Sequence, residues 1–444
     1  MVSGRSTGTL HGFTIPLAFA TTVTMWAMAY VGRLPAVMAP SWAIAVAMLA
    51  AVLTWAFWAA RRSAIDWAGG ARIGAVVGIL NLLILGSFLS SPDGGLRPSA
   101  IWWVPASVFT LAVLAAVGAA VGTSGATTES SPPDSTALFS KVAVAATFLL
   151  VVAGGLVTSQ EAGLAVVDWP NTFGSNMFLY PLSRMTGGIY YEHAHRLFGA
   201  LVGLTTIALA GRLWRLETRS WVKWLAGAAA VAVIVQGVLG GLRVTGNLTL
   251  STAVEDMAPN IALAVAHGVL GQLFLGLMVT LAAVTSVWWR KAPESEPRPT
   301  ASADRTLQAS LVGVLLLQLV FGAIQRHLAQ GLIIHITLAA VVAMLAIAAG
   351  ARAWGLYHGS WPVQRLGQLV MAVMTIQVTL GIAALAVTQG QAVVGDPTVF
   401  EVTLATAHQA TGALLLAVSV LLMVWTMRLF VVASSEETDY AASH

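Results

Sequence analysis

The sequence predicts an all-α, polytopic membrane protein with about twelve transmembrane helices. Of its 444 residues, 57% are hydrophobic and only 9% are charged, and the mean hydropathy is +0.82. So few charges cannot cover the surface of a water-soluble protein of this length. Apolar runs of about 20 residues recur along the chain, and each is long enough to cross a bilayer. The lipid bilayer is therefore the first partner that the sequence predicts.

The composition also excludes several classes of function. The net charge of +4 does not indicate a nucleic-acid partner, because the basic residues lie in short segments between the apolar runs. The chain has no Cys, which excludes disulfides, thiolate metal sites and covalent c-type haem attachment. The first apolar run, 13–31, is longer than a usual signal-peptide core and lacks a clear cleavage site, so we expect a retained helix.

Two polar stretches divide the apolar runs into three groups of four. One is TSGATTESSPPDST at 123–136, and the other is KAPESEPRPTASADR at 291–305. The expected spans are 13–31, 39–60, 73–90, 100–122, 138–157, 191–211, 222–242, 259–288, 307–325, 331–351, 366–387 and 401–430. The predicted organisation is a four-helix membrane extension (1–122), a low-complexity linker (123–137), a first four-helix bundle (138–289), a charged Pro-rich linker (290–306), a second four-helix bundle (307–432) and a polar tail (433–444). The two bundles are pseudo-repeats of each other.

The placement of Lys and Arg predicts the orientation. With the N-terminus in the cytoplasm, sixteen basic residues fall in cytoplasmic segments and six fall outside. This bias predicts a plasma-membrane protein with both termini in the cytoplasm. The six outer residues are Arg33, Arg97, Arg184, Arg196, Arg243 and Arg326.

After residue 138 the helices repeat in pairs. The first helix of each pair is expected to end in a Gly-containing turn, and the second carries one His near its start. A small residue follows each His by four places, on the same helical face, where a flat ligand can approach closely. The glycines are Gly154, Gly240, Gly322 and Gly381; the histidines are His195, His267, His335 and His408; the small residues are Gly199, Gly271, Ala339 and Gly412.

This register predicts haem ligation. His195 and His267 would face inward in the first bundle, and two further histidines would do so in the second, all near the outer side. Two inward imidazoles in a four-helix bundle suit one bis-His haem. The alternative is that each imidazole is a packing residue bonded to a backbone carbonyl. The predicted iron ligands are His195, His267, His335 and His408, with Arg196, Arg243 and Arg326 as partners of the haem propionates.

The first bundle differs from the second around Glu192. This residue lies one turn before His195, and we expect a catalytic carboxylate that handles protons. Arg196 follows Glu192 by four places, so an intrahelical ion pair is the alternative. A long polar loop precedes the helix, and its Asp168 and Trp169 are expected to contact the substrate. The second bundle has a short loop and no matching carboxylate, which suggests that it holds a cofactor or passes electrons.

Three motifs resemble the heme A synthase family of cytochrome oxidase assembly proteins, over about 138–430. They are VTSQEAGLAVVDWP, the Glu192-x-x-His195-Arg196 run, and LGGLRVT at 239–245 followed by His267-Gly268. The resemblance implies oxidation of a methyl group of haem O to a formyl group. It implies that Glu192 is the essential glutamate and that His195 and His267 ligate the substrate haem. It also implies that His335 and His408 ligate a haem b cofactor through its iron.

The resemblance implies further partners and leaves alternatives. Haem O, the haem O-producing enzyme and an unidentified electron donor are the expected partners, and a homo-oligomer is compatible with the family. Two mechanisms are compatible with this oxidation. Either an oxidant made at the iron attacks the methyl group, or the reaction passes through a carbocation that the porphyrin stabilises. The extension 1–122 has no counterpart in the family and is expected to be a scaffold or a docking site for a partner, with a separate activity as the alternative. His193 and His327 are candidates for assisting the site.

A b-type cytochrome that only transfers electrons is the alternative function, and a transporter is a third.

Overall fold

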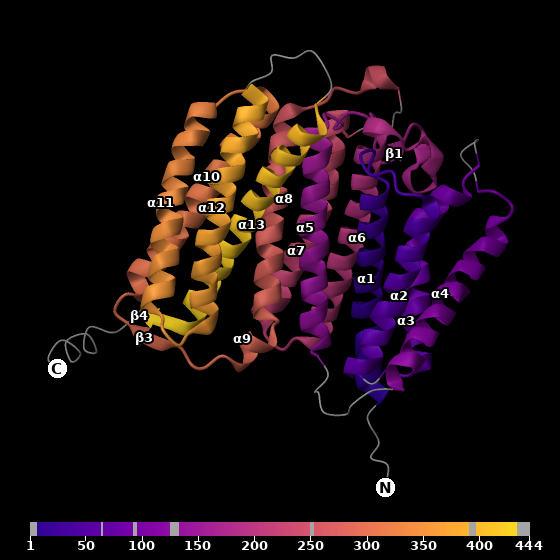
Figure 1. Ribbon diagram of the computed structural model, residues 1–444, viewed down its shortest axis with the longest axis horizontal. Coiled ribbons are helices and arrows are strands. Elements are labelled where there is room, and N and C mark those ends of the chain that lie inside the picture. Colours follow the sequence, from indigo (N-terminus) through magenta and orange to yellow (C-terminus); the bar gives the residue numbers. More distant parts are fainter. Residues whose placement is uncertain are drawn as a thin grey trace, which may run out of the picture. The chain divides into compact units, whose positions relative to one another are not determined.

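The computed structural model describes residues 7–63, 65–91, 96–124, 133–248, 253–389 and 397–432 (Figure 1). Within these ranges, twelve helices are long and apolar enough to cross a membrane, which confirms the predicted all-α polytopic fold. The tail 433–444 and the middle of the linker 123–137 lie outside the described residues. The long helices are α1 (Thr7–Gly32), α2 (Ser41–Ser63), α3 (Trp67–Leu89), α4 (Ala100–Thr123), α5 (Ser135–Ser159), α6 (Gly187–Leu216), α7 (Ser220–Thr245), α8 (Ile261–Val284), α10 (Ala301–Leu328), α11 (Leu332–Leu356), α12 (Trp361–Gln389) and α13 (Val399–Leu429).

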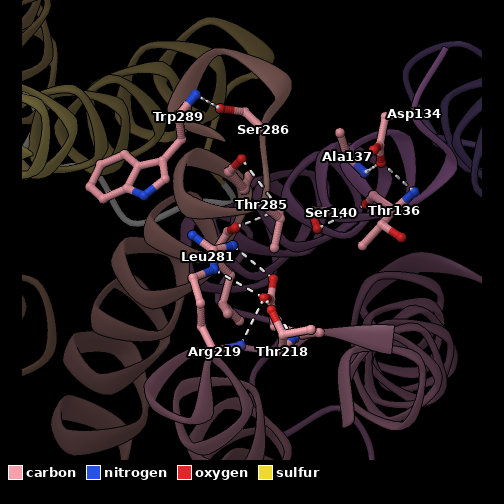
Figure 2. A network of polar contacts seen from close by, with 12 residues as sticks. Asp134, Thr136, Ala137, Ser140, Thr218, Arg219, Leu281, Thr285, Ser286 and Trp289 are labelled. Atoms are coloured by element: carbon pink, nitrogen blue, oxygen red, sulfur yellow. Dashed lines mark hydrogen bonds and ion pairs between the residues drawn. The ribbon is translucent and has the colours of Figure 1, made fainter. Parts of the chain in front are cut away.

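Short elements complete the described part of the chain. A five-residue helix, α9 (Val287–Lys291), interrupts the predicted span 259–288, because the side chain of Ser286 accepts the backbone N–H of Trp289 and starts a new helix (Figure 2). The other elements are β1 (Asn171–Thr172), β2 (Ser175–Asn176), β3 (Glu296–Arg298), β4 (Phe430–Val432), and the 3₁₀ turns η1 (Met177–Leu179), η2 (Leu182–Arg184) and η3 (Val254–Asp256). Strands β1 and β2 pair antiparallel, and β3 and β4 pair parallel.

The chain forms two compact units. The first comprises Met1–Gly237 and Val244–Pro259, and the second comprises Val238–Arg243 and Asn260–His444. Helix α7 contributes to both units. His195 lies in the first unit and His267 lies in the second, so the pairing of these two rings around one haem stays a prediction.

In the first unit, helix α1 is central. It packs against α2 and α3 of the extension and also against α5 and α6. The rings of Phe19 and Phe139 meet at 5.3 Å between centroids. Helices α3 and α4 approach closely through glycine, since a Cβ at Gly74 would lie 2.1 Å from the Leu111 carbonyl oxygen. The extension is thus packed onto the helices that carry the predicted site.

The second unit is a four-helix bundle of α10, α11, α12 and α13, with α8 against α10 and α13. At one end, the buried Asp304 carboxylate accepts from Arg352 Nε at 2.6 Å and from the Tyr357 hydroxyl at 2.5 Å. Arg428 donates to the carbonyls of Ala292 and Pro293. The segment that the sequence suggests to be a linker therefore has defined contacts, including the β3–β4 pairing.

Polar side chains mark where helices begin. The Asp134 carboxylate accepts the backbone N–H groups of Thr136 and Ala137 at 2.9 and 2.8 Å and so caps α5 (Figure 2). In the turn between α6 and α7, Glu217 accepts the N–H groups of Thr218 and Arg219. It also forms an ion pair of 2.7 Å with the Arg219 guanidinium. These contacts hold the turn that joins the two helices.

Glu217 makes stability depend on pH. Mainly through the side-chain hydrogen bond from Arg219, and against the effect of burial, its pKa is lowered from 4.5 to about 2. Because the folded-state pKa is depressed, the ionised carboxylate stabilises the fold above pH 4.5, and this contribution is lost as the pH falls toward 2. We expect Glu217→Gln to flatten the dependence of Tm on pH in this range, and Arg219→Gln to do the same. Thermal unfolding of the detergent-solubilised protein at several pH values measures this dependence of Tm on pH. A wild-type slope in Glu217→Gln contradicts the assignment.

Candidate functional site

All four repeated histidines lie against a glycine of the preceding long helix. A Cβ added at any of these glycines would come within 3.1 Å of the Cε1 atom of a His ring. The ring can therefore lie close to the neighbouring helix only because the glycine has no side chain. The pairs and distances are Gly154–His195 at 3.1 Å, Gly240–His267 at 3.1 Å, Gly322–His335 at 3.0 Å and Gly381–His408 at 2.8 Å.

The expectation that these glycines form turns at helix ends is wrong. Gly154 and Gly240 lie inside α5 and α7, more than one turn before the helices end, and Gly322 and Gly381 lie inside α10 and α12. Glycine is tolerated within a helix, where its role here is close packing rather than a left-handed turn. The repeat that the sequence displays is therefore a repeat of helix–imidazole contacts.

The second unit brings His335 and His408 together. Their ring centroids are 6.3 Å apart and their planes are inclined by 80°. Two imidazoles that ligate one metal ion from opposite sides, through bonds of about 2 Å each, have centroids about 6 Å apart. His408 Nδ1 lies 3.2 Å from the Gln377 carbonyl oxygen, which leaves Nε2 as the ring nitrogen that would ligate a metal ion. This pair fits an iron between two histidines.

The matching contacts of His335 are similar but not identical. His335 interacts with the backbone of Gln318, which precedes Gly322 by four residues as Gln377 precedes Gly381. The side-chain amide of Gln318 also lies 3.4 Å from His335 Nε2. A metal ion at Nε2 would require this amide to turn aside.

Just before His195, residues 190–193 of α6 are buried. Helix α6 begins at Gly187, and Glu192 is only 3% exposed. Arg196 Nε lies 3.2 Å from Glu192 Oε1, so the intrahelical ion pair, the alternative to a purely catalytic carboxylate, is present. A buried carboxylate with a fixed counter-charge can still exchange a proton with a substrate.

The remaining donors of Arg196 hold the preceding loop. Its Nη1 donates to the carbonyls of Asp168 at 2.6 Å and Asn171 at 3.2 Å, and its Nη2 donates to the carbonyl of Val166 at 2.8 Å. One guanidinium therefore joins the carboxylate of Glu192 to the loop backbone. These contacts describe a loop anchor, whereas the sequence suggests a partner of haem propionates.

Asp168 also has a structural role in the loop. It is 2% exposed, and its two carboxylate oxygens accept the N–H groups of Phe173 and Gly174, each at 2.8 Å. These two residues form the tip of the β1–β2 hairpin and have φ angles of 49° and 74°, as a type I′ turn requires. Trp169 is half-buried beside it. The hairpin was not predicted, although the Gly at its second turn position is a sequence signal.

His193 is a further residue of this site. It is fully buried, its Nδ1 lies 3.1 Å from the Thr172 hydroxyl, and its ring packs on Tyr180 at 5.2 Å between centroids. Its Nε2 has no hydrogen-bond partner among the described residues. His193 and Arg196 thus attach the hairpin to α6 at two points.

In the second unit, three basic residues lie near one another. His327 interacts electrostatically with both Arg243 and Arg326. The structure thus brings together two of the three arginines that the sequence suggests for haem propionates. It adds a histidine that sequence reasoning left only as a candidate.

The fold and these contacts define an integral membrane protein with four histidines that each pack against a glycine of a neighbouring helix. Residues 137–336 match the COX15-CtaA family, described as cytochrome oxidase assembly protein. This match confirms the resemblance to the heme A synthase family over the residues concerned.

Two heme A synthases are among the similar proteins and agree with the family match. The heme A synthase of Bradyrhizobium sp. strain BTAi1 is 29% identical over 219 residues, covering 42% of this chain and 55% of that protein. The heme A synthase of Rhodopseudomonas palustris strain HaA2 is 25% identical over 212 residues, covering 41% and 54%. The protoheme IX farnesyltransferase of Haloarcula marismortui is 30% identical over 138 residues, covering 31% and 27%. The chain thus spans about half the length of the two synthases and about a quarter of the farnesyltransferase.

The contacts of Asp168 lead to a prediction about the loop. In Asp168→Asn, one carboxylate oxygen becomes an NH₂ group that faces a backbone N–H. We expect the hairpin to lose about 1–3 kcal/mol of local stability. Hydrogen exchange of the peptide containing Phe173 and Gly174 measures this as faster exchange. The control is Glu161→Gln, which changes an exposed loop carboxylate outside the hairpin and is expected to stay within about 0.5 kcal/mol. Unchanged exchange in Asp168→Asn would contradict the role.

Proposed function

We propose that this protein is a membrane haem A synthase that oxidises a methyl group of haem O to a formyl group. The observation that carries the proposal is the buried Glu192, paired with Arg196 and placed one turn before His195 under an ordered loop. The family match over 137–336 supports it. We place the protein in the plasma membrane, with both termini in the cytoplasm and the haem sites toward the outer side. The haem O-producing enzyme and an electron donor are its partners.

In this proposal each histidine pair has its own haem. His335 and His408 hold haem b, and their 6.3 Å separation supports this assignment. His195 and His267 bind the iron of the substrate haem, and Trp169 contacts its porphyrin. Arg243 and Arg326, with His327 beside them, receive haem propionates. Haem b, when bound, supplies one-electron redox chemistry.

Glu192 handles protons at the reacting carbon. Two successive hydroxylations of the methyl carbon each take one oxygen atom from O2 and reduce the other to water with two electrons from the donor and two protons, and the resulting hydrated aldehyde loses water. Both hydroxylations consume protons, and the Glu192 carboxyl group relays them to the reacting site. Arg196 keeps the carboxylate in place through its ion pair, while the loop backbone fixes the guanidinium. The buried hairpin anchors exclude water from this region.

The alternative function is electron transfer by a bis-His cytochrome of b type. The geometry of His335 and His408 favours it, because it needs nothing more than one ligated haem. Electron transfer alone does not require the Glu192 carboxylate or the ordered loop. A variant that lacks the Glu192 carboxylate therefore separates the two functions.

The first test analyses extracted haems. Wild-type protein expressed with a source of haem O should produce haem A or the hydroxylated intermediate. Glu192→Gln should lower this product at least about 100-fold, since proton transfer contributes about that much or more, and it should retain bound haem. Glu161→Gln, at an exposed loop carboxylate, is the control that should keep product formation. Neither product in wild type would overturn the synthase, whereas full product formation in Glu192→Gln would contradict the catalytic role of this carboxylate.

The second test concerns haem retention. In Gly381→Ala the new Cβ would lie 2.8 Å from His408 Cε1 and displace the ring. We expect haem b affinity to fall about tenfold or more, as for other losses of ligand orientation, and Gly322→Ala to act in the same way. Reduced-minus-oxidised spectra and haem extraction measure this. Gly355→Ala in α11 is the control, because its Cβ would meet nothing within 4 Å. Equal haem content in all three variants would exclude ligation between these rings.

A further inference from the structure

Helices of the N-terminal extension contact the predicted catalytic segment at two separate places. We propose that α1 and α3 position Glu192: α1 holds the first turns of α6, and α3 forms a seat for the loop above them. The inference rests on the proposed role of Glu192. It gives the extension a direct part in the reaction, in place of a general role as scaffold or docking site.

Helix α1 contacts α6 on both sides of the Glu192–His195 turn. The Tyr190 hydroxyl donates to the Tyr30 carbonyl at 2.6 Å, and the two rings stack at 5.7 Å between centroids. Farther along α6, Phe198 meets Trp26 edge-on at 6.2 Å. Tyr190 and Phe198 are both buried. The residues between them therefore cannot shift along or around the helix axis without breaking one of these contacts.

Helix α3 supports the loop through its backbone. A Cβ at Gly86 would lie 2.4 Å from the Phe178 carbonyl oxygen, so the helix and the η1 turn meet where α3 has no side chain. The neighbouring Ser87 hydroxyl donates to the same carbonyl at 3.4 Å. The position of η1 is thus set by α3 and not by the loop alone.

The loop transmits this position to Glu192. Turn η1 directly follows β2, which pairs with β1 in the hairpin. The hairpin is fixed to α6 by the Thr172–His193 contact, and the Asn171 carbonyl accepts from Arg196. Arg196 in turn pairs with Glu192. A chain of direct contacts therefore joins Gly86 to the carboxylate, and a misplacement of about 1 Å can lower a rate about 100-fold.

The decisive variant is Gly86→Ala in the full-length protein. We expect its kcat for haem O oxidation to fall about 10- to 100-fold, with little change in KM and in bound haem. Chymotrypsin should also cleave the loop several-fold faster, at the exposed Phe173. The control is Gly122→Ala, which places a Cβ 2.6 Å from the Phe57 carbonyl oxygen between α4 and α2. This control introduces a similar steric clash within the extension, but between α2 and α4 and not at the contact between α3 and the loop.

A second pair of variants removes one hydroxyl each from the stacked tyrosines. Tyr190→Phe loses the bond to α1 and should lower kcat while KM stays unchanged. Tyr30→Phe is the control, because the Tyr30 hydroxyl has no hydrogen-bond partner in the part of the chain described. This pair keeps the stacking and tests the same idea if Gly86→Ala fails to fold.

The outcomes separate the two proposals. Faster loop cleavage in Gly86→Ala but not in Gly122→Ala supports the inference that α3 positions the loop, whatever product the enzyme makes. Wild-type cleavage and kcat in Gly86→Ala, or equal effects in Gly122→Ala, overturn the inference. If wild type makes no haem A, the synthase assignment fails, and the cleavage rates still decide whether α3 holds the loop.

Discussion

The absence of a Cβ at four helix positions is the constraint on which the candidate haem sites depend. Each glycine lets an imidazole of another helix approach to about the van der Waals limit. In the second unit this brings His335 and His408 to a separation suited to one metal ion between them. The placement of these two rings therefore depends on the distance between the helices, and the carbonyl of Gln377 orients the His408 ring.

Much of the fold could be predicted because its signals are periodic. The apolar runs gave twelve spans, and four histidines in register pointed to equivalent places. The sequence also shows the four glycines before the histidines, but it predicts helix-end turns where the structure has close helix contacts. Gly is common in both places, so its identity alone does not decide between them. Only the structure separates these two uses, through the position of His195 against Gly154 inside α5.

What could not be predicted depends on contacts between distant segments. The sequence shows Asp168 as a polar loop residue, but its role depends on the amides of Phe173 and Gly174, which no spacing rule places at its oxygens. The parallel pairing of Glu296–Arg298 with Phe430–Val432 joins residues more than a hundred positions apart. Long-range main-chain pairing of this kind leaves no local pattern in either segment.

The contact between Gly86 and Phe178 has a consequence for how the sequence can vary. It joins the main chain of a helix to a main-chain carbonyl, so it does not depend on the rotamer of Phe178, although the Leu179 side chain also lies 3.1 Å from the Gly86 Cβ position. The identity of residue 178 can then change during evolution while its main chain keeps the same contact with α3. The glycine in α3 is the position that has to persist, although it lies outside the segment that matches the family.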